Sequence, residues 1–204
     1  INPRGGEIAG QLNAREVFEQ MVQLAWKTGD PGIVFLDRIN RDNPNPQLGE
    51  IESTNPCGEQ PLLPYESCNL GSINLARMVT FTDNDVVMDW DRLARVTHTA
   101  VHLLDNVIDM NQYPISEIAD MSRTTRRIGV GVMGWSDLLV EMGIRYDSQE
   151  ALDLAEQVMK YIQEESYKAS GNLVDSRGTF PAWDGSAYNN SSTYRKMRNS
   201  APVT

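Results

Sequence analysis

The 204-residue sequence has few of the residues on which metal sites and disulfide scaffolds depend, with only two cysteines and two histidines. Two cysteines do not make the disulfide framework of a small secreted domain, and a transient redox cysteine fits a reducing compartment better. Zinc is also a poor explanation for the cysteines, because neither has a second Cys or His at ligand spacing.

Long apolar runs and an excess of basic residues are absent as well. The sequence has no run of 18 apolar residues and no signal-peptide pattern, which predicts a cytoplasmic protein with no membrane partner. Its net charge of −10 argues against a nucleic-acid partner held by a basic surface. The length suffices for one sizeable core, and 40% hydrophobic with 23% charged residues is ordinary for a globular protein.

Both cysteines lie in one stretch, residues 54–72, whose three prolines and two glycines argue against a regular helix. Cys57 has Asn55 two residues before it and Glu59 two residues after it. In an extended backbone these three side chains share one face, which would place the thiol between an amide and a carboxyl group. The thiol is then a hydrogen-atom or electron donor, the carboxylate a general base and the amide an orienting group. The alternative is a buried structural cysteine in a loop.

The sequence of this stretch resembles a motif of a known family. Asn-Pro-Cys-Gly-Glu-Gln-Pro-Leu-Leu-Pro at 55–64 and Cys-Asn-Leu-Gly-Ser-Ile-Asn-Leu at 68–75 resemble the active-site finger loop of ribonucleotide reductases. The adenosylcobalamin-dependent class, class II, matches best. Weaker similarity covers residues 26–32, 127–134 and 198–204.

The resemblance implies a role for each residue of the loop. Cys57 would be the transient thiyl that takes the 3′ hydrogen of the ribose, and Glu59 the general base for the 3′-OH. Asn55 would hydrogen-bond the substrate, and Cys68 would be one of two reducing thiols that end as a disulfide. Its partner is expected upstream of this chain, which has no third cysteine. The substrate would be bound by Asn55, Pro56, Cys57, Gly58 and Glu59.

The resemblance also implies the fold and the partners. Residues 1–204 would be a single domain, an internal part of the ten-stranded α/β barrel that is incomplete at both ends. The expected activity is that of a vitamin B12-dependent ribonucleoside-diphosphate reductase, which makes deoxyribonucleotides for DNA synthesis. The expected cofactor is adenosylcobalamin, and the expected reductant is thioredoxin or glutaredoxin. The complete enzyme would be a homodimer with dNTP and ATP effectors.

Three alternatives remain open at this point. The chain could belong to a class I reductase that needs a separate metal-bearing radical subunit. It could be an inert structural fragment of a split reductase. It could also be a nucleotide-binding module, since residues 129–134 formally match G-x-G-x-x-G. The acidic residue of that fingerprint is missing, because Glu150 lies at a predicted helix start, and we interpret the glycines as allowing close strand–helix packing.

Apolar spacing and capping residues predict the regular elements. Asn13 predicts the start of a first helix, which Gly29-Asp30-Pro31-Gly32 ends. The apolar run at 33–36 predicts a strand buried on both faces of a parallel sheet. The other predictions are a turn within 1–12, an extended segment at 51–55, a strand or helical turn at 70–75, helices at 89–111, 116–127 and 148–167, and a loop at 171–190.

Two further groups of residues carry charge or metal-binding capacity. His98 and His102 lie four residues apart on one face of the predicted helix at 89–111, a spacing that can clamp a metal ion. The simpler interpretation is a solvated or partly buried helix face. Arg195, Lys196 and Arg198 form a small basic cluster, which is either a solvated face or a neighbour of a phosphate.

Overall fold

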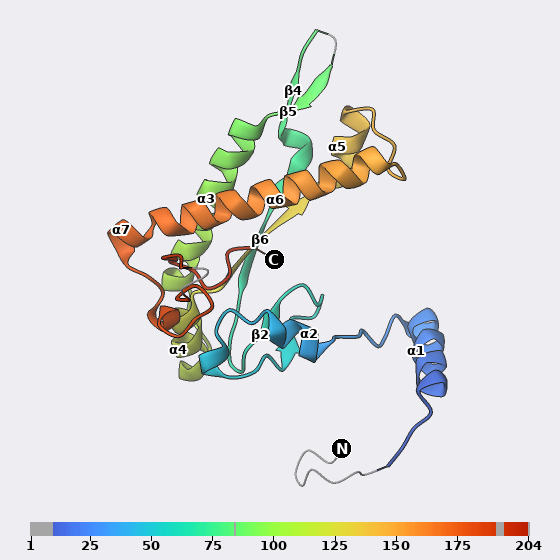
Figure 1. Cartoon of the computed structure of the whole chain (residues 1–204), viewed down its shortest axis with the longest axis vertical. Coiled ribbons are helices and arrows are strands. Elements are labelled where there is room, and N and C mark those ends of the chain that lie inside the picture. The colour runs from blue at the N-terminus through green and yellow to red at the C-terminus, as the bar shows by residue number, and fades with distance from the viewer. Residues whose placement is uncertain (1–9, 84, 191–193, 204) are drawn as a thin grey trace. The chain divides into compact units, whose positions relative to one another are not determined.

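A computed structural model describes residues 10–83, 85–190 and 194–203, and the chain divides into two compact units, residues 1–35 and 36–204 (Figure 1). The first unit contains helix α1 (Ala14–Thr28). The side chain of Asn13 caps it by accepting the N–H of Arg15 at 3.0 Å, and Gly29 ends it in the left-handed conformation. The predicted start and end of this helix are confirmed, whereas the predicted turn within 1–12 lies largely outside the described residues.

The prediction of a buried strand at 33–36 is wrong. Ile33, Val34 and Phe35 have no regular structure and are 47–66% exposed, and Leu36 begins the short helix α2 (Leu36–Arg41). A short apolar run has no periodicity that distinguishes a strand from other structures. It forms a strand only where a neighbouring strand can pair with its backbone groups. Among the described residues, 33–35 pair with no strand.

The centre of the second unit is a parallel pair of strands, β3 (Asn69–Asn74) and β6 (Ile128–Met133), aligned from Asn69 opposite Ile128 to Asn74 opposite Met133. Residues 201–203 follow the other edge of β6, where the N–H of Ile128 donates to the carbonyl of Ala201. A parallel bridge joins Val130 to Val203. The chain therefore contributes three neighbouring parallel segments to a sheet, as expected of an α/β fold.

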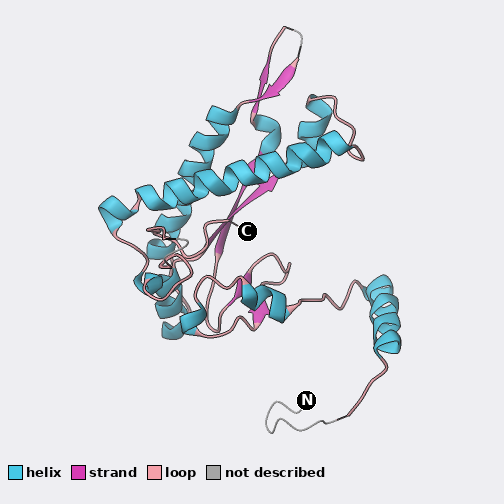
Figure 2. Ribbon diagram, in the orientation of Figure 1, coloured by secondary structure: helices cyan, strands magenta, loops and turns pink. Residues whose placement is uncertain are grey.

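Two long helices cover this pair of strands, α3 (Trp90–Met110) and α6 (Gln149–Asn172), and they pack against each other (Figure 2). Asp89 caps α3 and Ser148 caps α6, which confirms both predicted starts. Gly71 of β3 faces α3, where a Cβ would lie 3.5 Å from the side chain of Leu104, an ordinary packing distance. The core between strands and helices includes Ile73, Leu93, Val101, Leu104, Ile108, Ile128, Val130, Val158 and Ile162.

Shorter elements complete the second unit. The predicted extended segment at 51–55 contains β1 (Ser53–Thr54), which pairs antiparallel with β2 (Pro61–Leu62), and β4 (Val79–Phe81) pairs with β5 (Val86–Met88). The predicted loop at 171–190 is partly helical, because α6 runs on to Asn172 and two short helices follow. The remaining helices are α4 (Ser116–Thr125), α5 (Trp135–Glu141), α7 (Val174–Arg177), and the 3-10 turns η1 (Pro46–Leu48), η2 (Leu75–Arg77) and η3 (Pro181–Trp183).

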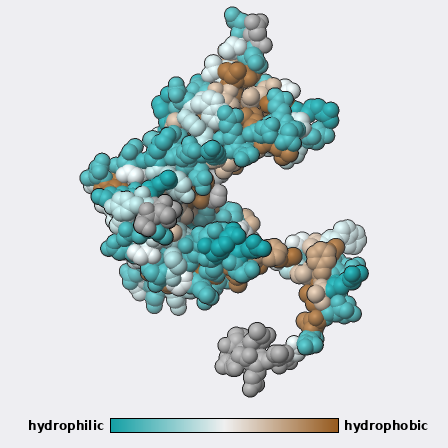
Figure 3. Space-filling model, viewed as in Figure 1, coloured by the Kyte–Doolittle hydropathy of each residue, from teal (hydrophilic) through white to brown (hydrophobic). Residues whose placement is uncertain are grey.

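The surface of the second unit is mainly polar on the face that carries α6, where hydrophilic residues predominate (Figure 3). Within the described part of the chain, none of the helices has the length and apolar character needed to cross a membrane.

Candidate active site

The β1–β2 hairpin carries the first cysteine on the loop 55–60. The N–H of Asn55 donates to the carbonyl of Gln60 at 3.2 Å, and the N–H of Gln60 donates to Oδ1 of Asn55 at 3.0 Å. The N–H of Gly58 closes a turn by donating to the carbonyl of Asn55 at 3.0 Å, with Gly58 at φ 84°. Glycine adopts this φ without the steric cost that a Cβ would add.

This geometry corrects the predicted local conformation. Residues 55–59 are a turn and not the extended segment that would put Asn55, Cys57 and Glu59 on one face by alternation. The loop nevertheless presents the sulfur to solvent, since Cys57 is a free and exposed thiol. The alternative of a buried structural cysteine does not describe Cys57 in this structure.

Glu59 lies at the edge of a pocket of about 320 Å³ over the parallel strands. Two glycines of β6, Gly129 and Gly131, form part of its wall and leave the backbone open to a ligand. The pocket is thus lined by both the carboxylate of the finger loop and residues of β3 and β6. Its other lining residues are Leu70, Ser72, Val132 and Met159.

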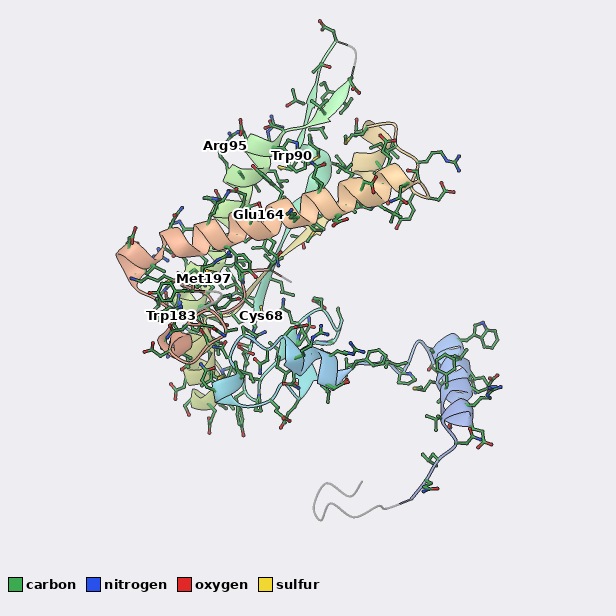
Figure 4. All side chains as sticks on the ribbon, viewed as in Figure 1. Cys68, Trp90, Arg95, Glu164, Trp183 and Met197 are labelled. Carbon is green, nitrogen blue, oxygen red and sulfur yellow. The ribbon has the colours of Figure 1, made fainter. Side chains whose placement is uncertain are left out.

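Cys68 lies directly before β3, on the side of the β1–β2 hairpin (Figure 4). It is a free, partly buried thiol whose S–H contacts the carbonyl of Asn69 at 3.4 Å. Burial raises the pKa of Cys68 to about 12, opposed by the positive charge of Arg127 and reinforced by the negative charges of Glu66 and Glu59. The effect of Glu59 on this thiol means that the finger loop and the start of β3 are electrostatic neighbours.

Glu66 and Arg127 form a buried ion pair beside Cys68, and sequence reasoning did not find it. Nε of Arg127 donates to Oε1 of Glu66 at 2.8 Å, with side chains 4% and 0% exposed. The available signal was the position of Arg127 at the start of the glycine-containing stretch 127–134 and of Glu66 two residues before Cys68. Nothing in the sequence pairs two residues that are 61 positions apart.

The histidines of α3 face different partners. Nε2 of His98 lies 2.8 Å from Oε2 of Glu165 on α6, and Nε2 of His102 lies 2.8 Å from Nη2 of Arg177 on α7. No cluster of three His, Cys, Asp or Glu side chains suited to a metal ion occurs in residues 10–83, 85–190 and 194–203. The structure therefore uses the two histidines in helix-to-helix contacts.

The glycines of 129–134 do not form a loop after a strand. Gly129 and Gly131 lie within β6, and Gly134 precedes α5 with φ 72°, where a Cβ would clash with Oδ1 of Asn74. A dinucleotide fingerprint requires its glycines at the strand-to-helix turn, so the alternative of a nucleotide-binding module has no geometric support here. The interpretation as close packing fits Gly134, and Glu150 lies in the first turn of α6 as predicted.

The basic cluster at 195–198 divides between two environments. The guanidinium of Arg195 stacks on the ring of Tyr167 at 4.4 Å, and with Lys196 it lines a pocket of about 500 Å³ beside α6. Arg198 turns inward, where Nη1 donates to the carbonyl of Arg177 at 2.9 Å. Neither cysteine lines that larger pocket, so it is separate from the thiol site.

These observations define a mixed α/β protein with two free thiols next to a pair of parallel strands. Residues 4–202 match the family described as "Ribonucleotide reductase, barrel domain", and the chain belongs to this family. The predicted α/β barrel fold is confirmed by this match. An Actinobacillus ureae class Id ribonucleotide reductase alpha subunit has the same fold, with a TM-score of 0.75 at 24% identity over 93% of this chain and 35% of its own.

The chain is similar to vitamin B12-dependent ribonucleoside-diphosphate reductases of two organisms. It is 51% identical to that of Thermoplasma acidophilum over 100% of this chain, and 52% identical to that of Mycobacterium tuberculosis over 97%. It is also 35% identical over 87% of its length to a ribonucleoside-diphosphate reductase subunit alpha of Chlamydia pneumoniae. The chain spans only 26% and 28% of the length of the first two relatives.

Proposed function

We propose that the complete protein containing this chain reduces ribonucleoside diphosphates to 2′-deoxyribonucleotides by a radical reaction that depends on vitamin B12. The single observation that carries this proposal is the placement of the finger loop. It exposes the sulfur of Cys57 at the end of a hairpin, with Glu59 at the edge of the strand pocket and Cys68 nearby. The 51% and 52% identities to B12-dependent enzymes, against 35% to a subunit alpha, favour this class over class I.

The exposed sulfur of Cys57 fits a radical source that approaches the hairpin from outside. When bound, adenosylcobalamin supplies the unpaired electron. Cys57, as a thiyl, takes the 3′ hydrogen of the ribose, and Glu59 takes the proton of the 3′-OH. Loss of the 2′-hydroxyl as water then becomes feasible.

Asn55 and Cys68 have supporting roles in this proposal. Because Oδ1 of Asn55 already accepts the N–H of Gln60, we expect this side chain to reach the substrate through its Nδ2 donor. The backbone of residues 55–59 lines the substrate site. Cys68 and a second cysteine outside this chain supply two electrons and two protons, so C2′–OH becomes C2′–H with release of water and formation of a disulfide.

The remaining parts of the proposal concern partners. We propose that a thioredoxin-type or glutaredoxin-type dithiol reduces the disulfide, and that the complete enzyme is a cytoplasmic homodimer with dNTP and ATP effectors. A single barrel domain including residues 1–204 is also part of this proposal. Family membership and the similarity to B12-dependent relatives support the assignment.

Cys57→Ser in the complete protein tests the function. We expect reduction of a ribonucleoside diphosphate, measured with adenosylcobalamin and a dithiol, to fall below detection because serine cannot form an equivalent radical. Thermal unfolding should be unchanged, since the side chain is exposed. Substantial product from the variant, or wild-type turnover that needs a metal subunit and no cobalamin, would count against the proposal.

A further inference from the structure

Arg127 holds the hairpin that carries Cys57. Its Nη1 donates to the carbonyl of Pro61 at 3.1 Å, and Pro61 is the first residue of β2, directly after the finger loop. Arg127 itself directly precedes β6. One side chain therefore fixes the base of the finger loop to the beginning of the central parallel strand.

Glu66 completes this connection from the opposite side. Its Oε1 accepts from Nε of Arg127 at 2.8 Å, and its Oε2 accepts the N–H of Leu63 at 2.9 Å. Leu63 is 1% exposed, so the carboxylate is anchored in the core of the turn that leads to Cys68. Both oxygens of the buried carboxylate are thus used, as a buried charge requires.

The strand register brings Arg127 next to Cys68. Because Asn69 is opposite Ile128 in the parallel pair, the preceding residues, Cys68 and Arg127, lie side by side where the two strands begin. Nη2 of Arg127 is buried and has no hydrogen-bond partner among the described residues. A buried guanidinium with an unused donor is an uncommon and costly arrangement unless it faces a group that gains from its charge.

Three charged groups act on the sulfur of Cys68. Arg127, at the start of β6, favours the thiolate, whereas Glu66 in the preceding turn and Glu59 on the finger loop disfavour it. Burial disfavours it as well and raises the pKa of Cys68 to about 12. Arg127 is therefore the one group among these four influences that stabilises negative charge on this sulfur.

Resting on the reductase function proposed above, we propose that Arg127 is a positioning residue for the redox cysteine. It fixes the Cys57 hairpin to the start of β6 and supplies the positive charge that stabilises the thiolate of Cys68. The step that uses this charge is re-reduction by a dithiol. A thiolate of the reductant attacks the disulfide, the sulfur of Cys68 leaves as a thiolate and then takes up a proton, and the reductant ends as a disulfide. A leaving thiolate that is better stabilised leaves faster.

The test measures the reactivity of Cys68 directly, in the complete protein with Cys57→Ser as background. Iodoacetamide alkylation of Cys68 is followed by mass spectrometry of its peptide between pH 7 and 9. Because only the thiolate reacts, Arg127→Gln should slow the reaction about three- to tenfold at any given pH. Arg127→Lys should keep the rate within about twofold of the parent, because the charge remains.

Glu66→Gln separates electrostatics from loosening of the structure. It breaks the same ion pair as Arg127→Gln but removes a negative charge, so alkylation of Cys68 should become about two- to fivefold faster. A merely structural role predicts the same direction for both variants. Arg92→Gln is the matched control, because Nη1 of Arg92 likewise donates to backbone carbonyls, those of Arg77 and Val79 at 3.0 and 3.3 Å, which follow the end of β3 opposite to Cys68.

Changes in the same direction for Arg127→Gln and Glu66→Gln, or no change in either, overturn the inference. If Arg127→Gln does not fold, Arg127→Lys takes its place: a rate within about twofold of the parent, beside faster alkylation in Glu66→Gln, supports the inference, and equal acceleration in both variants overturns it. In the protein that retains Cys57, Arg127→Lys should lower turnover although the charge remains. Lysine lacks the planar fork that reaches Glu66 and Pro61 together. The alkylation result does not depend on turnover, so failure of the proposed reductase activity would be recognised separately, from the unsubstituted enzyme.

Discussion

Arg126 and Arg127 are consecutive residues, yet their side chains enter two regions of opposite character. Arg126 ends α4 in the left-handed conformation, with φ 49°, and its guanidinium turns toward Asp105 and Asp109 on α3. Arg127 turns toward Glu66 and the finger loop. The backbone reversal at Arg126 thus separates a structural cluster from the candidate site.

The buried carboxylate of Asp105 is the centre of a hydrogen-bonded cluster. Asp105 is 0% exposed and accepts from Nε of Arg126 at 2.9 Å, Nη1 of Arg177 at 2.8 Å and Nδ2 of Asn199 at 3.0 Å. Every nitrogen of the Arg126 guanidinium donates to an oxygen. This cluster joins α3, α4, α7 and the segment that follows the basic residues, and both carboxylate oxygens of Asp105 accept hydrogen bonds within it.

The thiol region differs in each of these respects. Cys57 is exposed, Nη2 of Arg127 has no partner among the described residues, and a pocket adjoins Glu59. Unsatisfied and exposed reactive groups cost stability, and proteins retain them chiefly where chemistry needs them. The two regions therefore call for different measurements. Turnover tests the thiol region, and unfolding tests the cluster around Asp105.

The largest expected effect concerns Glu59. Removing a general base typically costs about 10²–10⁴ in rate, so Glu59→Gln should lower turnover of the complete enzyme by that range. Its free energy of unfolding should not change, because Glu59 is exposed. Glu52→Gln is the matched control, an exposed glutamate just before β1, and should keep full turnover. Equal losses in the two variants would show that turnover does not depend on a general base at Glu59.

Asp105→Ala should have the converse effect on stability. It removes the buried carboxylate that Arg126 and Arg177 share and leaves Arg126 only the half-exposed Asp109 as a charged partner, which should cost about 3–5 kcal/mol. Urea unfolding measures this loss. Asp109→Ala is the control, since the Asp109 side chain is 51% exposed and its loss should cost about 1 kcal/mol or less. If Asp105→Ala left the unfolding midpoint unchanged, the cluster would not be the structural region described here.

Sequence reasoning found the features that depend on local rules. The caps at Asn13, Asp89 and Ser148 were predictable because each side chain bonds its own first helical turn. The motif wording at 55–64 and 68–75 was enough to identify the loop that carries Cys57 and Cys68.

The parts that sequence reasoning missed depend on contacts between distant residues or on a single φ. The pairs Glu66–Arg127 and Asp105–Arg126 are 61 and 21 residues apart, so no periodicity reveals them. The turn at the finger loop depends on the positive φ of Gly58, whereas the extended alternative was argued from spacing alone. The apolar run at 33–36 predicted a strand because composition alone does not say whether a partner strand is present.

The smallest expected effect is a difference in pH response between the two regions. Burial raises the pKa of Cys68 in the folded protein to about 12, compared with an ordinary value of 9.0. Above pH 9 the unfolded chain therefore releases a proton that the folded chain retains, and stability falls as pH rises, by at most about 1.4 kcal/mol per pH unit. Between pH 9 and 10, partial exposure of Cys68 reduces the expected loss to about 0.5–1 kcal/mol.

The cluster responds at the acid end instead. The hydrogen bonds from Arg126 hold the pKa of Asp109 below its ordinary value, so that contribution is present at neutral pH and lost as pH falls through the lowered pKa. Urea unfolding of the wild type and Cys68→Ser at pH 8 and 10 should show the larger alkaline loss in the wild type, and equal losses would contradict the buried thiol. Asp109→Ala should keep that alkaline loss and weaken the acid response, because the two regions titrate independently.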